Sequence, residues 1–94
     1  MSVDIAGNPW KFAQDGVGTN PVGFSYFGYV DFRDCVITKV ANIGDRIYFT
    51  DFSGRTIIDF TAEQAQDSFR MGKLGWVNGL KCVQFDSGEM IVAV

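Results

Sequence analysis

Residues 22–40 read VGFSYFGYVDFRDCVITKV, and this stretch decides the fold class. β-Branched and aromatic residues dominate it, as is typical of extended strands. One alternating face carries Val30 and Phe32 and is interrupted by Asp34, which predicts a bulge or a strand break at that point. The other alternating face carries Tyr29, Asp31, Arg33, Cys35 and Ile37.

The segments that follow this stretch also predict short antiparallel strands. Residues 45–50 and 55–60 flank the turn Asp51-Phe52-Ser53-Gly54, in which Gly54 can adopt a positive φ. Asn78-Gly79 lies between apolar residues and predicts another tight turn. Further strands are expected at residues 10–14, 80–85 and 89–94.

About seven short strands separated by turn signals predict an all-β fold, a small antiparallel β-sandwich or barrel. We expect a single domain over residues 1–94, with 1–9 as a partly irregular N-terminal arm. Residues 15–21 predict a loop, and residues 61–71 a loop with at most one helical turn. The last strand, 89–94, is apolar on both faces, so it should lie centrally in a sheet or beneath a partner chain.

The composition lacks histidine and is rich in aromatic residues. The 94 residues contain no His, yet they include nine Phe, three Tyr and two Trp. Because His most often transfers protons near neutral pH, its absence argues against an enzyme and excludes Ser-His and Cys-His pairs. A chain this short has difficulty burying so many rings by itself, so we expect some rings to contact a partner.

Other kinds of site find little support in the sequence. Asp31, Asp34, Asp45 and Asp51 lie at strand ends or beside turns, where carboxylates usually cap the backbone, and no loop has calcium-site spacing. We therefore expect no catalytic residue, no cofactor and no metal. The eight basic residues are dispersed and the net charge is −3, which argues against nucleic acid. No run reaches the ~18 apolar residues of a membrane span.

The two cysteines, Cys35 and Cys82, lie in apolar, strand-like runs. We expect two buried free thiols, and a disulfide is the alternative. The first five residues show neither the charged nor the apolar segment of a secretory signal. Synthesis in a reducing cytoplasm, which disfavours a disulfide, is consistent with both observations.

Residues 24–29 are aromatic on both alternating faces, which leaves two interpretations open: a core strand or a contact surface. One small domain usually covers only one face of an antiparallel sheet, so the second face would need another layer. A neighbouring subunit is the simplest source of that layer. The candidate interface residues are therefore Trp10, Phe12, Phe24, Tyr26, Phe27, Met90, Val92 and Val94.

The order of several short motifs along the chain carries a family resemblance. The motifs are Ile5-Ala6-Gly7-Asn8-Pro9-Trp10, Gly28-Tyr29-Val30, Ile43-Gly44-Asp45, Asp51-Phe52-Ser53-Gly54-Arg55, Trp76-Val77-Asn78-Gly79-Leu80 and Asp86-Ser87-Gly88. In this order they resemble small all-β proteins encoded among the structural genes of tailed bacteriophages. The resemblance implies a virion protein without enzymatic activity, made in the host cytoplasm, and in particular a capsid decoration protein.

A decoration protein would use two kinds of partner. It would associate with itself, with a trimer favoured because trimers suit local threefold axes, and it would dock on the major capsid protein or another virion protein. Two alternatives stay open: a tail or head–tail connector subunit, and a carbohydrate- or ligand-binding module. In the second, Trp10 and Trp76 would stack on sugar rings while Asp or Asn side chains hold hydroxyl groups.

Overall fold

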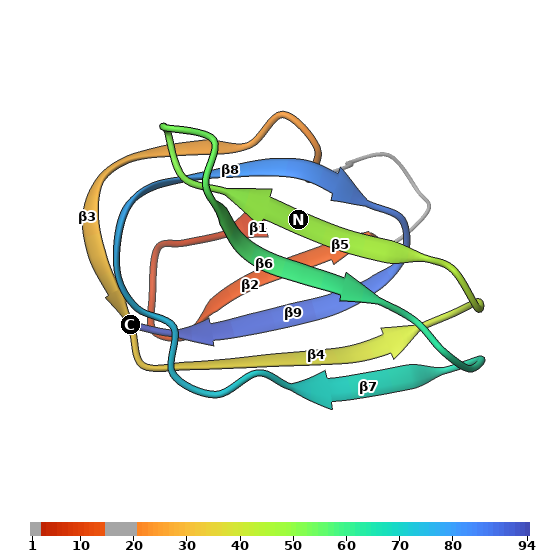
Figure 1. Cartoon of the computed structure of the whole chain (residues 1–94). Helices are drawn as coiled ribbons and strands as arrows, with labels where there is room; N and C mark the ends of the chain where they lie inside the picture. Colours follow the sequence, from red (N-terminus) through yellow and green to blue (C-terminus); the bar gives the residue numbers. More distant parts are fainter. Residues whose placement is uncertain (1–2, 15–20) are drawn as a thin grey trace.

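The computed structural model describes residues 3–14 and 21–94 of the chain. These residues form nine strands in two antiparallel sheets that pack face to face (Figure 1). The expected all-β sandwich is thereby confirmed. The strands are β1 (Val3–Asp4), β2 (Trp10–Gln14), β3 (Ser25–Phe32), β4 (Asp34–Val40), β5 (Arg46–Thr50), β6 (Thr56–Thr61), β7 (Asp67–Arg70), β8 (Gly75–Phe85) and β9 (Gly88–Ala93).

One sheet has the order β1-β2-β9-β4-β7 and the other has the order β3-β8-β5-β6. Strand β9, apolar on both faces, lies at the centre of the five-stranded sheet, between β2 and β4. The expectation of a central position for this segment is therefore confirmed. Its inward side chains, Met90 and Val92, are fully buried, and the backbone groups along both its edges are paired, which protects it from strand exchange.

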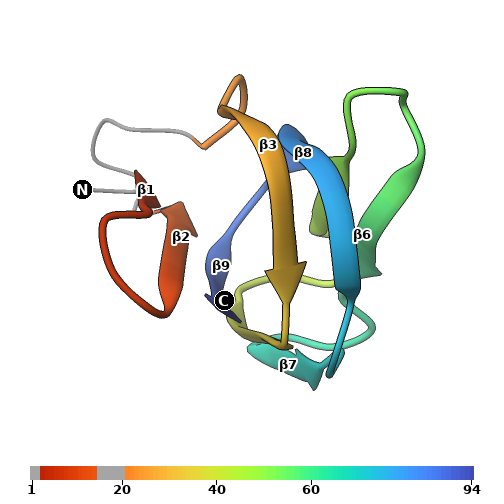
Figure 2. The ribbon, with the colours of Figure 1, turned by 90° about the vertical axis from the view of Figure 1, so that its left-hand side faces the viewer.

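Figure 2 shows the two layers from the side, with β2 and β9 in one sheet and β3, β8 and β6 in the other. Aromatic rings from both sheets fill the space between these layers. Phe12 of β2 meets Phe49 of β5 edge to face, with ring centroids 5.2 Å apart. Trp10 meets Phe32 of β3 in the same manner at 5.6 Å. Edge-to-face pairs add about 0.5–1.5 kcal/mol each to the free energy gained from burial. Inward-facing rings of β2, β3 and β5 thus form part of the interior.

The long extended stretch of the sequence divides at Arg33 into β3 and β4, which belong to different sheets. Asp34 stands at this division, as expected. Its carboxylate accepts a hydrogen bond from the Cys35 N–H and pairs with Arg70, which ties β4 to the edge strand β7. The break therefore carries the chain from one layer to the other.

Two expectations about local structure are wrong. Residues 67–70 form strand β7 along β4, where we expected a loop with at most one helical turn, because Phe69 pairs in register with the buried Ile37. Asn78-Gly79 lies inside β8 and forms no turn. Gly79 has φ +82° and lies opposite the register shift between Tyr26 and Tyr29, where two residues of β3 oppose this single residue of β8. The bulge is therefore in β3, and β8 continues through Gly79 without a turn.

The start and the end of the described chain are joined by a side chain. The Asn8 amide donates to the Val94 carbonyl oxygen at 2.8 Å and accepts from the Val94 N–H at 3.0 Å. The expected loop at residues 15–21 lies mostly outside the described residues. Among those residues, no helix is long and apolar enough to span a membrane.

Candidate functional site

All eight residues expected at an interface are described, and the structure separates them into three groups. Trp10, Phe12, Met90 and Val92 are core residues, at most 6% exposed. Phe24, Tyr26 and Val94 are half-buried and pack against the core. Phe27 is 77% exposed. The first group is corrected here: the opposite sheet of the same chain covers those side chains, so they are not available on the surface.

A different set of rings is exposed on the outer side of β3 and β8. Tyr29 and Trp76 are 72% and 69% exposed, close to the value for Phe27. Directly opposite residues share one side of a sheet, and the register pairs Tyr29 with Asn78 and Asp31 with Trp76. These four side chains therefore lie on one outward surface. We call the four rings of this region, Phe27, Tyr29, Phe52 and Trp76, the aromatic face.

Phe52 reaches the aromatic face from the turn between β5 and β6. Its ring lies on Gly79, where a Cβ atom would be only 1.8 Å from the Phe52 Cδ2 atom. It stacks on Phe27 with ring centroids 4.4 Å apart and planes 11° from parallel, and the Lys81 ammonium lies 5.0 Å from its centroid. Two rings from distant segments thus form one flat surface because Gly79 has no side chain.

Asp31, which lies beside the aromatic face, has few hydrogen-bond and ion-pair partners. Asp31 Oδ2 lies 3.9 Å from the Arg33 Nε atom, and that side chain is 73% exposed, so the ion pair is weak. Asp31 Oδ1 is buried and has no hydrogen-bond partner within residues 3–14 and 21–94. An unpaired buried carboxylate oxygen is unfavourable, so a hydrogen-bond donor arriving here would stabilise the site.

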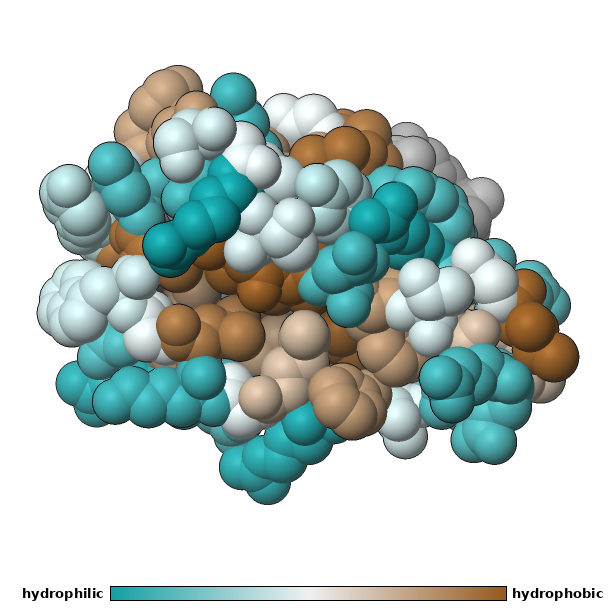
Figure 3. Space-filling model, in the orientation of Figure 1, coloured by the Kyte–Doolittle hydropathy of each residue, from teal (hydrophilic) through white to brown (hydrophobic). Residues whose placement is uncertain are grey.

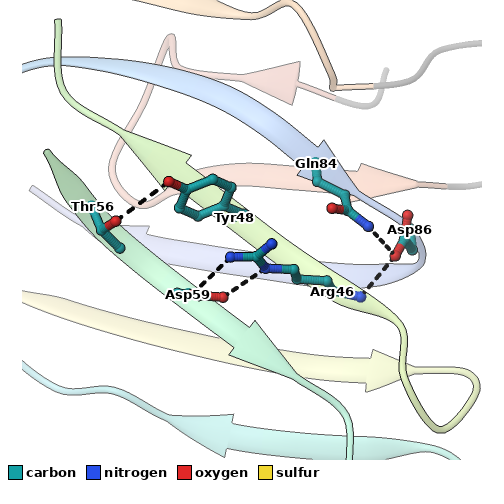
Figure 4. A network of polar contacts seen from close by, with 6 residues as sticks. All are labelled: Arg46, Tyr48, Thr56, Asp59, Gln84 and Asp86. Carbon is teal, nitrogen blue, oxygen red and sulfur yellow. Dashed lines mark hydrogen bonds and ion pairs between the residues drawn. The ribbon is translucent and has the colours of Figure 1, made fainter. Parts of the chain in front are cut away.

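The other half of the same outer surface, over β5 and β6, is polar and internally paired (Figure 4). The Arg46 guanidinium donates to both Asp59 carboxylate oxygens, at 2.8 and 2.9 Å, and lies 4.2 Å from the Tyr48 ring centroid. This hydrogen bond raises the pKa of Arg46 and lowers the pKa of Asp59. Asp86 accepts hydrogen bonds from the Arg46 N–H and the Gln84 amide. The polar side chains of this surface thus satisfy one another.

Both thiols are buried, and Asp45 and Asp51 accept hydrogen bonds from other groups of the chain. Cys35 and Cys82 are buried free thiols, as expected, and burial raises the pKa of each to about 12, which leaves both protonated at neutral pH. Asp51 accepts hydrogen bonds from Ser53 and Arg55 and holds its turn, while Asp45 accepts one from the Ser87 hydroxyl. Among the described residues, no three acidic or Cys side chains come together as metal ligands would.

Sequence reasoning singled out Phe27 and Trp76 but missed Tyr29 and Phe52 as surface residues. A signal for Tyr29 was present, because its alternating face continues with Asp31 and Arg33, which mark the solvent side of a strand. No local sequence signal predicts the position of Phe52, because the sequence of a tight turn does not show which distant strand its ring will contact. No protein-family model, curated protein or solved structure matches the chain.

Proposed function

We propose that this protein is a non-enzymatic virion component of a tailed bacteriophage, a capsid decoration protein that docks through its aromatic face. The observation that carries the proposal is the gathering of Phe27, Tyr29 and Trp76, each more than two-thirds exposed, on one end of one sheet. Large exposed rings are costly in a solitary protein and are enriched at contact surfaces. The order of sequence motifs that resembles phage structural proteins supports the class of assembly.

A comparison of the two halves of the outer surface supports docking through the half over β3 and β8. The half over β5 and β6 pairs Arg46 with Asp59 and stays hydrated, whereas the half over β3 and β8 offers rings and an unpaired Asp31 oxygen. A partner that covers the aromatic face removes apolar surface from water without breaking existing ion pairs. Weak single contacts of this kind become strong attachment when a trimer engages several capsid subunits at once.

The test begins with particles of the phage whose genome encodes the chain. Mass spectrometry of purified virions should find the protein in a fixed ratio to the major capsid protein, and electron microscopy should place it on the head. Purified protein should rebind particles that lack it. A ring at the neck or tail would instead indicate the connector subunit. Absence from the particle, or a gene that lies in no phage genome, would reject the proposal.

Matched variants connect this binding to the aromatic face. Trp76→Ser should reduce rebinding about tenfold or more, since exposed aromatic anchors often contribute 2 kcal/mol or more at interfaces. Ile43→Ser is the control, because Ile43 is 72% exposed but lies in the turn between β4 and β5. Equal rebinding by both variants would show that the docking surface lies elsewhere on the molecule.

A second candidate function, carbohydrate binding, is favoured by one arrangement on the same face. Trp76 stands beside Asp31 and diagonally beside Tyr29, with Asn78 opposite Tyr29, so a stacking ring lies among groups that bind hydroxyls. Trp10 cannot contribute, because it is buried in the core. Oligosaccharides that bind here should quench or shift Trp76 fluorescence, and Asn78→Ala should weaken that response. If the protein rebinds capsids and its fluorescence does not respond to sugars, carbohydrate binding is rejected and only the docking proposal remains.

A further inference from the structure

A second unpartnered region lies where the two sheets end together, at strands β6 and β7. Each is the terminal strand of its sheet, and Phe60 of β6 stacks on Phe69 of β7 with ring centroids 5.9 Å apart and planes 18° from parallel. Phe69 is 51% exposed. Apolar side chains are visible in a hollowed band across this side of the molecule, with hydrophilic groups above and below (Figure 3). We call this region the open edge; its lining includes Asp59, Thr61, Glu63 and Asp67.

The backbone of β6 is available for pairing at the open edge. The Ala62 N–H donates to the Asp45 carbonyl, and the Ala62 carbonyl accepts from the Gly44 N–H, so both groups point toward the β5 side. Backbone groups alternate in direction along an antiparallel strand. Thr61 and Asp59 therefore direct their N–H and C=O groups away from the sheet, and no described strand pairs with them there.

The charge around the open edge is negative. Glu63 and Asp67 lie beside the stacked rings, and neither forms a salt bridge within the described part of the chain. Asp67 accepts hydrogen bonds from the Glu63 and Ser68 N–H groups, which fixes its position beside Glu63. Asp59 is already paired with Arg46 and adds little. A segment that carries Lys or Arg would complement the two remaining carboxylates.

We propose that the open edge binds an extended, basic segment of a partner protein by strand addition to β6. The segment would exchange main-chain hydrogen bonds with Asp59 and Thr61 and place one apolar side chain against the Phe60–Phe69 pair. A Lys or Arg at an alternate position would meet Glu63 and Asp67. Main-chain pairing supplies affinity in this mode of recognition, and the alternating side chains supply specificity. This site is separate from the aromatic face and does not depend on the docking proposed above.

The probe is a blocked hexapeptide of alternating Val and Lys, and its control is the same peptide with Glu in place of Lys. Titrated into the isotopically labelled protein, the Val/Lys peptide should shift the amide resonances of Asp59 and Thr61 and slow their hydrogen exchange, which is fast in the free protein. The Val/Glu peptide should bind at least fivefold more weakly. Shifts confined to the aromatic face, or equal binding of the two peptides, would overturn the assignment.

Two variants separate the backbone contribution from the charge contribution. Thr61→Pro removes the outward N–H and should weaken Val/Lys binding about 2- to 10-fold, whereas Thr61→Val keeps the N–H and should bind normally. Glu63→Lys leaves the backbone N–H groups in place and should weaken Val/Lys binding about 2- to 5-fold. This variant therefore tests the proposal even if the proline variant fails to fold. Unchanged affinity in both Thr61→Pro and Glu63→Lys would refute strand addition. Concentration-dependent shifts at β6 without peptide would assign the edge to a second copy and refute the basic partner.

Discussion

The contact of Phe52 with Gly79 supports the sharpest prediction about this fold. In Gly79→Ala the new methyl group would stand 1.8 Å from one ring carbon of Phe52 and 2.2 Å from the next, far inside van der Waals contact. The ring must therefore leave its position. The backbone at residue 79 would also be strained, because φ is +82° and a side chain disfavours that conformation.

The two contributions can be estimated separately. A left-handed backbone costs a non-glycine residue about 1–2 kcal/mol. Overpacking a filled site costs about 1–3 kcal/mol more, so Gly79→Ala should lower the free energy of unfolding by about 2–5 kcal/mol. In a Phe52→Ala background the methyl group has room, and only the backbone contribution of about 1–2 kcal/mol should remain. The difference between the backgrounds measures the contact itself.

Urea unfolding of the four proteins of this cycle, followed by far-ultraviolet circular dichroism, supplies the free energies. The slopes of the transitions should agree, which shows that the variants unfold in the same two-state manner. Gly79→Ala should also release the Phe27–Phe52 stack and weaken docking through the aromatic face. An equal cost of Gly79→Ala in both backgrounds would refute the placement of Phe52 on Gly79. A cost below about 0.5 kcal/mol in the wild-type background would refute the left-handed backbone as well.

Three further predictions follow from burial and hydrogen bonding. Acrylamide should quench Trp76, which is 69% exposed, but not Trp10, so Trp76→Phe should leave a protein whose emission resists the quencher. Cys35 and Cys82 should resist a disulfide reagent at pH 8 while the protein is folded and react upon unfolding, because burial raises the pKa of each thiol to about 12; rapid labelling of the native protein would contradict this. The hydrogen bond from the Ser53 hydroxyl lowers the pKa of Asp51 in the folded protein. The ionised Asp51 carboxylate should therefore contribute fully to the free energy of unfolding above the ordinary pKa of about 3.9. This contribution should be lost as the pH falls through the lower pKa of the folded state. Asp51→Asn should flatten that part of a stability–pH curve, and an unchanged curve would show that the turn does not depend on the charge.

Turn signals and β-type composition were sufficient to predict the class of fold. The hairpin of β5 and β6, the division near Asp34 and the central position of the apolar segment 89–94 all depend on neighbours close in sequence or on a hydrophobic excess. Such features are encoded locally, because glycine conformation and alternation of side chains act within a few residues. Strand β7 was not predicted for the opposite reason, since its pairing with β4 joins residues that are 27 to 34 positions apart in the sequence.

The sequence by itself therefore determined an antiparallel β-protein with two free thiols and more rings than a short chain readily hides. Tertiary structure alone decided which rings are hidden. Trp10 and Phe12 are as aromatic as Tyr29 and Trp76, but the first two face the opposite sheet and the last two face outward. The reason is that strand register and the stacking of sheets fix the direction of each side chain, and both depend on contacts between segments distant in sequence. The aromatic face is consequently a property of the folded sandwich and of Gly79, against which the Phe52 ring lies.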